Sequence, residues 1–292
     1  SFRQVSHHKL YEDFKVNGST VILESSGGDE IGGGYTGFLW PLFLDQIKII
    51  GYDKALDNLI KNLKIHKFNK SKIDSFMKAG SYNQEFYGTS TSDGQRIINT
   101  ECISEDFDKK YDNGPPTYKK IFDSHLLNSQ YIELFHTKLP RGLRYVDRAS
   151  SSSGRESRVP LLSREIVEFC FSISNELKIK DGQLRWFMKK SLNYLNKKNI
   201  KLSNKRSIAD PQRIWMKKNL KHLFLSVFKS NKFKNRGIFN QKEVLKSYYN
   251  FLKDNNAHSL GIFQIFITEI WIRLFFDNNH KNFKNEKLNE FI

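Results

Sequence analysis

The residues most able to do chemistry in this chain come directly after a short apolar run at positions 21–23. The run is largely β-branched and predicts a buried strand, and the turn that follows it has no bulky side chain. Small residues let a ligand approach the backbone closely, and free N–H groups beyond a strand can receive an anion. The residues of interest here are Glu24, Ser25, Ser26, Gly27, Asp29 and Glu30. Their place at the carboxyl end of a strand predicts a binding site, since open α/β sheets hold ligands there.

Other interpretations apply to the same glycine-rich stretch. Residues 32–37 match the string G-x-G-x-x-G of dinucleotide-binding folds, but no strand leads directly into them. No Gly-Lys-Ser/Thr triplet follows the glycines, which excludes a Walker-type phosphate loop. A flexible turn that joins a strand to a helix is the simplest alternative on this stretch alone.

A second informative stretch covers residues 139–162, where five arginines and two acids are interleaved around a small polar loop. Forked guanidinium groups bind carboxylates and phosphates at two points, which suits an anionic ligand. Arg148, Glu156 and Arg158 suit an internal ion network that braces the loop equally well. The residues themselves leave both interpretations open.

The composition indicates a globular chain with a basic surface. Its 292 residues are 38% hydrophobic and 14% aromatic, which allows a sizeable core and excludes a disordered chain. The formal charge of +17 is dispersed over many short runs, which favours a solvated surface over a nucleic-acid interface. Cys102 and Cys170 lie far apart and predict reduced thiols in a cytoplasmic protein. No Cys/His cluster has the spacing of a zinc site, and we predict no metal-ligating residues.

Hydrophobic periodicity predicts many helices and few strands. A strand is expected at 20–23, a long irregular surface excursion at 81–116 and an Asn/Lys-rich tail at 277–292. Helices are expected at 7–16, at 38–80 with a break at Gly51, and at 118–135, 163–173, 184–195 and from Pro211 to about 276. In the helix at 163–173, the side chains expected to face inward are Ile166, Val167, Phe169 and Cys170. The apolar stretch at 260–276 contains charged residues and predicts a buried helix rather than a membrane span.

Three ordered motifs resemble the C-terminal synthetase domain of the glutamine-hydrolysing asparagine synthetase family. Residues 23–35 follow the spacing of the family signature L-[SDE]-G-[EQ]-G-[AG]-D-E-x-x-[GA]-G-Y, with the departures described below. The family elements D-R-x-S and E-x-R-V-P-[FL]-L are matched by residues 147–150 and 156–162. The family's lysine loop, followed by a proline and a tryptophan, is matched by Lys205, Pro211 and Trp215.

The resemblance implies an α/β fold of the adenine nucleotide α-hydrolase-like, Rossmann-like class, of which this portion is mostly α-helical with few strands. Residues 1–276 would form a partial synthetase domain, followed by the tail at 277–292. The implied enzyme is an asparagine synthase of the glutamine-hydrolysing type, a carbon–nitrogen ligase that uses ATP and Mg²⁺. It adenylylates the β-carboxylate of aspartate, and ammonia derived from glutamine then attacks the acyl-adenylate.

The resemblance also implies a role for each site residue. Lys205 would stabilise the pentavalent phosphorus and the acyl-adenylate, and Ser26 occupies the family's second catalytic position. The residues implied to contact ATP are Glu24, Ser25 and Gly27. Those implied to bind the substrate are Asp29, Glu30, Arg148, Glu156 and Arg158. We expect these residues and Lys205 to converge on one phosphate-handling pocket.

The departures from the family pattern concern the chemistry. Ser26 stands where the family has a Glu or Gln that acts as general base or positions the intermediate, and serine is no comparable base. Ser25 replaces a glycine and Ser163 an aspartate. The family's S-G-G-x-D-S pyrophosphate loop and its glutaminase with a Cys nucleophile precede the matched motifs, and we expect them upstream or on another chain.

Two alternatives to asparagine synthesis follow from these departures. One is a different amide-forming relative, of the β-lactam synthetase or peptide cyclase type, because the motifs do not specify the acyl substrate or the amine. The other is a degenerate protein that keeps the fold and binds a partner without catalysis. Neither a membrane nor a nucleic acid is an expected partner.

Overall fold

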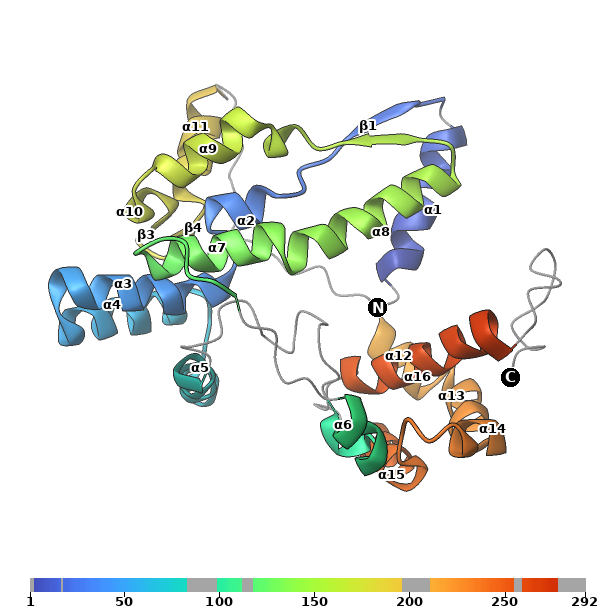
Figure 1. Ribbon diagram of the computed structural model, residues 1–292. Coiled ribbons are helices and arrows are strands. Elements are labelled where there is room, and N and C mark those ends of the chain that lie inside the picture. The colour runs from blue at the N-terminus through green and yellow to red at the C-terminus, as the bar shows by residue number, and fades with distance from the viewer. Residues whose placement is uncertain are drawn as a thin grey trace. The chain divides into compact units, whose positions relative to one another are not determined.

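The computed structural model describes residues 3–16, 18–82, 99–111, 118–195, 211–254 and 259–277 (Figure 1). The chain divides into two compact units. Unit 1 comprises Ser1–Arg3, Gly94–Gly114 and Ile208–Ile292, and unit 2 comprises Gln4–Asp93 and Pro115–Ser207. The first two motifs therefore both belong to unit 2.

Unit 2 is mostly helical with few strands, as the sequence predicts. Its N-terminal elements are α1 (Arg3–Val16), β1 (Val21–Leu23), α2 (Gly28–Gly32), α3 (Leu39–Ile50), α4 (Tyr52–Ile65) and α5 (Lys70–Tyr82). After residue 118 they are α7 (His125–Phe135), α8 (Lys138–Ser152), β2 (Glu156–Arg158), α9 (Arg164–Ser172), α10 (Asn175–Lys178), β3 (Ile179–Lys180), β4 (Gln183–Leu184) and α11 (Trp186–Leu195). The predicted break at Gly51 is confirmed, because this residue separates α3 from α4 with a φ of 82°.

Strands β1 and β2 pair in parallel and join the first two motifs (Figure 1). Ile22 packs with residues of α1 and α8. The prediction of a buried strand is wrong for Val21 and Leu23, whose side chains are 40% and 70% exposed. Neighbouring side chains of a strand point to opposite faces, and the described helices cover only the face that holds Ile22.

Helix α7 begins at His125, later than the predicted helix at 118–135, because its N-terminus is fixed by two polar side chains. Ser124 is the N-cap residue, and its hydroxyl donates to a carboxylate oxygen of Asp45 on α3 at 2.6 Å. The same carboxylate accepts hydrogen bonds from the N–H groups of His125 and Leu126 at 2.6 and 3.1 Å. The free N–H groups of a helix start are satisfied in this way, and α7 is anchored on α3.

Helix α8 corrects the prediction of a small polar loop among the arginines of residues 139–162. It is continuous from Lys138 to Ser152, and only a short turn separates it from β2. Pro140 lies in its first turn, where no N–H donor is required. Near its end the hydroxyls of Ser150 and Ser152 donate to carbonyl groups of the preceding turn, which lets these serines remain helical.

Helix α9 confirms the predicted helix at 163–173. Of the four side chains predicted to face inward, however, one is exposed. Cys170 is buried, and Ile166 and Val167 are partly buried against the same core. Phe169 is 57% exposed, so its prediction is wrong. Its neighbour Cys170 is the residue that packs, and adjacent residues on a helix point about 100° apart.

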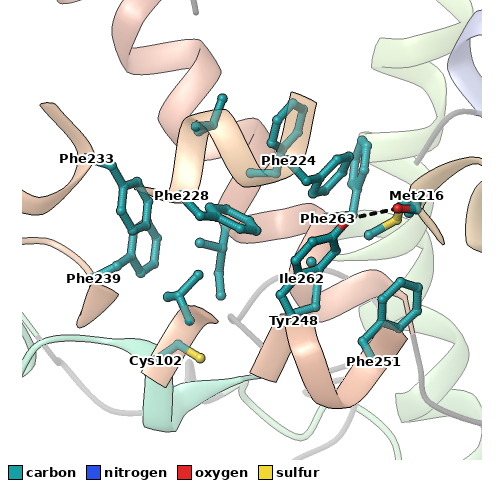
Figure 2. Packing of buried hydrophobic residues seen from close by; sticks show 14 of the residues in the cluster. Cys102, Met216, Phe224, Phe228, Phe233, Phe239, Tyr248, Phe251, Ile262 and Phe263 are labelled. Carbon is teal, nitrogen blue, oxygen red and sulfur yellow. Dashed lines mark hydrogen bonds between the residues drawn. The ribbon is translucent and has the colours of Figure 1, made fainter. Parts of the chain in front are cut away.

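Unit 1 is a helical assembly around an aromatic core (Figure 2). Its elements are a 3₁₀ turn (Thr100–Cys102), α6 (Glu105–Tyr111), α12 (Gln212–Lys217), α13 (Lys221–Lys229), α14 (Asn231–Asn235), α15 (Gln241–Lys253), α16 (Leu260–Ile272) and a π turn (Arg273–Asp277). The rings of Phe224 and Phe266 stack with centroids 4.0 Å apart, and the Tyr248 hydroxyl donates to the Met216 carbonyl at 2.8 Å. Cys102 is fully buried in this core and α6 is helical, so the predicted irregular surface excursion at 81–116 is wrong for these residues. Residues 83–98 and 112–117 lie outside the described residues.

The C-terminal end of α16 carries a buried ion network. Glu269 is 0% exposed and accepts hydrogen bonds at 2.7 Å from Arg236 and from Arg273. Arg236 also pairs with Asp277 at 2.6 Å, so the chain is packed up to this residue, and 278–292 lie outside the described residues. None of the helices that the structure describes has the length and apolar character needed to cross a bilayer.

Candidate functional site

The turn after β1 is built by two glycines in left-handed conformations on either side of α2. Gly27 has a φ of 90° and precedes the helix, and Gly33 has a φ of 71° and ends it. Other residues adopt such values only with strain, which explains glycine at both ends of a five-residue helix. The stretch is thus a turn that joins a strand to a short helix, as the simplest alternative also has it.

The glycines of α2 also permit close packing against the second motif. A Cβ atom on Gly27 would lie 2.8 Å from Cγ of Leu162, and one on Gly28 would lie 2.9 Å from Cδ1 of Leu161. On the other side, a Cβ atom on Gly32 would lie 2.8 Å from the sulfur of Met188. Side chains thus occupy these places: Gly27 and Gly28 are packed against the V-P-L-L segment, and Gly32 is packed against Met188.

Backbone pairing continues from the sheet into the turn. The N–H of Glu24 donates to the carbonyl of Arg158 at 2.8 Å, and the Ser26 hydroxyl donates to the Glu24 carboxylate at 3.2 Å. Ser25 is exposed. Within the described parts of the chain, the N–H groups of Ser25, Ser26 and Gly27 have no hydrogen-bond acceptor. These amides are thus free to receive an anionic group at the end of β1.

The two acids of the signature lie in different surroundings. Asp29 is partly exposed, and its Oδ1 lies 3.2 Å from Nη1 of Arg185. Glu30 is 5% exposed, and its carboxylate accepts a hydrogen bond from the Tyr35 hydroxyl at 2.6 Å. Burial and the neighbouring Glu30 raise the pKa of Tyr35, so the phenol stays protonated and remains a donor. Asp29 can therefore face a ligand, whereas Glu30 serves a contact inside the protein.

The charged residues of the second motif lie on exposed surfaces. Arg148 is exposed on α8. Arg158 donates to Glu156 at 2.6 Å on one face of β2, and this contact lowers the pKa of Glu156 and raises that of Arg158. Both side chains are more than half exposed, so water screens the pair and it adds little to stability. The exposed guanidinium of Arg158 can still meet an anionic ligand, which is one of the two open interpretations.

Lys205 lies outside the described residues, in the segment 196–210. Its convergence with the turn after β1 therefore stays a prediction. The structure brings the first and second motifs together through the β1–β2 pairing, and it gives Glu24, Ser26 and Arg158 a common edge.

Three residues at the site escape prediction from sequence: Gln130, Lys178 and Arg185. The Gln130 side chain donates to the carbonyls of Glu30 and Ile31 at 2.7 and 2.9 Å, and Lys178 donates to Gln130 at 2.9 Å. None of the three belongs to a motif quoted above. Lysine is usually exposed, and nothing in the local pattern marks Lys178 as a buried residue.

No group of three or more His, Cys, Asp or Glu side chains in the described residues is arranged to hold a metal ion. One oxygen of Asp29 is already shared with Arg185. A magnesium ion that arrives with ATP would therefore be held mainly through the phosphates. The free amides after β1, by contrast, fit an anionic nucleotide.

The similarity to known proteins covers the whole region that contains the motifs. The family model described as "Asparagine synthase" matches residues 2–273. The chain is 22% identical over 285 residues to the protein named "Asparagine synthetase (glutamine-hydrolyzing) 1" from Bacillus subtilis (strain 168). The alignment covers 92% of this chain but 42% of that protein, so the chain spans less than half of its relative's length. No solved structure matches significantly, and the finer Rossmann-like assignment stays a prediction. By the extent of the family match, this chain belongs to the asparagine synthase family.

Proposed function

We propose that this chain is the synthetase portion of an ATP-dependent amide ligase that makes asparagine from aspartate. The observation that carries the proposal is the parallel pairing of β1 with β2, which puts the glycine-rich turn beside the arginine-containing strand. The free amides of the turn and the exposed guanidinium of Arg158 then lie at one edge, where negative charge can be bound.

The reaction has two steps. A β-carboxylate oxygen of aspartate attacks the α-phosphorus of ATP, and pyrophosphate leaves. Ammonia then attacks the acyl carbon, the bond from carbon to the bridging oxygen breaks, and AMP leaves with that oxygen. Activation is needed because a carboxylate becomes a good electrophile only when one of its oxygens is converted into a leaving group.

In the first step, negative charge gathers on the α-phosphate. The free amides of Ser25, Ser26 and Gly27 are suited to binding phosphate oxygens, and fixed donors of this kind stabilise charge that develops in a transition state. We assign Lys205 the role of the cation at this phosphate. Magnesium, when bound with ATP, supplies further charge neutralisation.

We assign Asp29 to the α-ammonium group of the substrate. Its carboxylate is partly exposed, and Arg185 holds one of its oxygens from the protein side.

We assign Glu24 the proton transfer that Ser26 cannot perform. Ammonia must lose a proton as it adds to the acyl carbon, and a carboxylate is a suitable acceptor. The Glu24 carboxylate lies 3.2 Å from the Ser26 hydroxyl, so this chain keeps a carboxylate next to the position where the family has Glu or Gln.

The proposed partners are aspartate, glutamine-derived ammonia and a portion that supplies the glutaminase and the pyrophosphate loop, from upstream or from another chain. The exposed apolar side chains of Val21 and Leu23 support this, because a two-stranded parallel sheet is rarely left with an uncovered face. A segment of that portion packed on this face would cover both side chains.

The test is aspartate-dependent exchange of labelled pyrophosphate into ATP, measured on the chain together with that portion. We expect exchange in the natural protein and a loss of about 10²-fold or more in Lys205→Ala. Lys201→Ala, in the same segment, is the matched control and should retain exchange. Full exchange in Lys205→Ala would remove this lysine from its role, and no exchange in the natural protein would remove the ligase function.

Ser26 also favours a second function, a non-catalytic protein that keeps the fold and binds a partner. This alternative predicts that ATP binds without any aspartate-dependent exchange. Exchange that depends on another carboxylic acid would instead identify a different amide-forming relative.

A further inference from the structure

A buried ammonium group lies beneath α2 and has no role in the reaction proposed above. Lys178 is 0% exposed at the end of α10, and its Nζ lies 5.4 Å from the ring centroid of Phe171. Within the described part of the chain, no carboxylate forms an ion pair with it, and its hydrogen-bond acceptor is Oε1 of Gln130 at 2.9 Å. A buried charge without an opposite charge is costly, so its retention calls for a reason.

The partner of Lys178 holds the end of α2. The Nε2 group of Gln130 donates to the carbonyls of Glu30 and Ile31, at 2.7 and 2.9 Å. The last four carbonyl groups of a helix receive no hydrogen bond from N–H groups of the same helix. In a helix as short as α2, most of the carbonyl groups are in this position. Gln130 therefore supplies the hydrogen bonds that the helix cannot make itself.

Lys178 determines which way the Gln130 amide points. An ammonium group is a donor only, so it can bond to the oxygen of the amide and not to its nitrogen. With the oxygen held by Lys178, the nitrogen must face the carbonyls of α2. A positive charge beyond the C-terminal end of a helix is also electrostatically favourable.

Packing keeps the two segments in contact. A Cβ atom on Gly33 would lie 3.4 Å from Cβ of Lys178 and 3.1 Å from Cγ1 of Ile179. The end of α2 thus rests directly on the segment that contains the lysine, and Asp29 lies one turn earlier on the same short helix.

We propose that Lys178 is a positioning residue: through the amide of Gln130 it fixes α2, and thereby directs the Asp29 carboxylate toward the ammonium group of the amino-acid substrate. This inference rests on the proposed function for the identity of that ligand. Lys178 itself does not contact substrate.

The first test is amide hydrogen exchange at residues 31–34, which needs no substrate. Lys178→Met keeps the length and the apolar stem but removes the donor, and we expect exchange about tenfold faster, corresponding to one lost buried hydrogen bond. Lys180→Met is the matched control, since Lys180 is exposed on the adjacent strand. Unchanged exchange at residues 31–34 in Lys178→Met, or an equal change in the control, would overturn the proposal.

A second variant keeps the test decisive if Lys178→Met folds poorly. Gln130→Glu keeps an acceptor for Lys178 but loses the donors to α2, so it should accelerate the same amides. In the double variant with Lys178→Met the effect should be no larger than in the worse single variant, because both act on one chain of hydrogen bonds. Additive effects would show that the two residues act separately.

Kinetic measurements distinguish a residue that positions Asp29 from a residue that only stabilises the fold. In Lys178→Met, the KM for aspartate should rise about tenfold while the KM for ATP stays unchanged, as expected for a weakened contact to one substrate. Equal effects on both substrates would overturn the assigned direction toward Asp29. If the natural protein shows no pyrophosphate exchange, the proposed function fails, while the hydrogen-exchange result still decides whether Lys178 fixes α2.

Discussion

Replacing Lys178 by methionine should change how the stability of unit 2 depends on pH. Burial lowers the pKa of the Lys178 ammonium group from 10.5 to about 8. In the unfolded chain the pKa returns to the ordinary value, so between these two values the unfolded state binds more protons than the folded state. The free energy of unfolding therefore rises with pH across this interval, up to about 10.5.

The magnitude follows from the two pKa values. Near pH 7 the buried group is protonated in both states, and its burial costs about 3 kcal/mol of stability. By pH 9 the folded state has largely lost the proton, which recovers about 1 kcal/mol of that cost. Burial also raises the pKa of the neighbouring thiol of Cys170, and this thiol is present in both the parent and the variant. Methionine at position 178 cannot be protonated, so the variant should lack the rise.

The assay needs a signal from unit 2 alone. Trp40 and Trp186 lie in unit 2, while Trp215 and Trp271 lie in unit 1 and can be replaced by phenylalanine in all proteins compared. Urea unfolding followed by fluorescence at pH 7, 8 and 9 then gives the free energy difference between the parent and the variant. We expect this difference to shift by about 1 kcal/mol in favour of the parent. A difference that is constant or moves the opposite way would refute the reasoning, and Lys180→Met should show no shift.

Three further predictions concern the turn after β1, the ion network of unit 1 and the second step of the reaction. Gly27→Ala should lower the unfolding free energy of unit 2 by about 2–4 kcal/mol, from the left-handed φ and the filled space; Gly142→Ala, on an open helix surface, should not lower it in the same urea titration. Glu269→Gln should cost unit 1 about 3–5 kcal/mol, because it removes the carboxylate charge that contacts the buried guanidinium of Arg273; a loss under about 1 kcal/mol in calorimetry would contradict this. Glu24→Gln should lower asparagine formation about 10²-fold while pyrophosphate exchange persists; equal loss of both would place Glu24 in the first step instead.

Local features of the chain were predictable because their causes are local. The β-branched run followed by small residues predicts β1 and the turn, and the glycine at position 51 predicts the break between two helices. Family resemblance identified the two motifs that the sheet joins. Residues of both motifs lie on the paired strands β1 and β2, so the two motifs meet at one edge of this sheet.

Tertiary features were not predictable from periodicity. The pairing of β1 with β2 joins segments more than 130 residues apart, and its register depends on helices that flank them. Lys178 is a charged residue that the local pattern would put in water, and only the partner Gln130 explains its burial. Cys102 belongs to a polar stretch, yet it fills a core built from residues after position 215.

The central claim is that a carboxylate is activated by transfer of AMP to it, and isotope transfer tests this most directly. Aspartate labelled with ¹⁸O in its β-carboxylate is incubated with ATP, ammonium and the chain together with the portion that supplies the pyrophosphate loop. Since the bond between the acyl carbon and the bridging oxygen breaks, the AMP released should carry one ¹⁸O atom, detected by mass spectrometry. ¹⁸O in inorganic phosphate with formation of ADP, or AMP without label, would contradict the account.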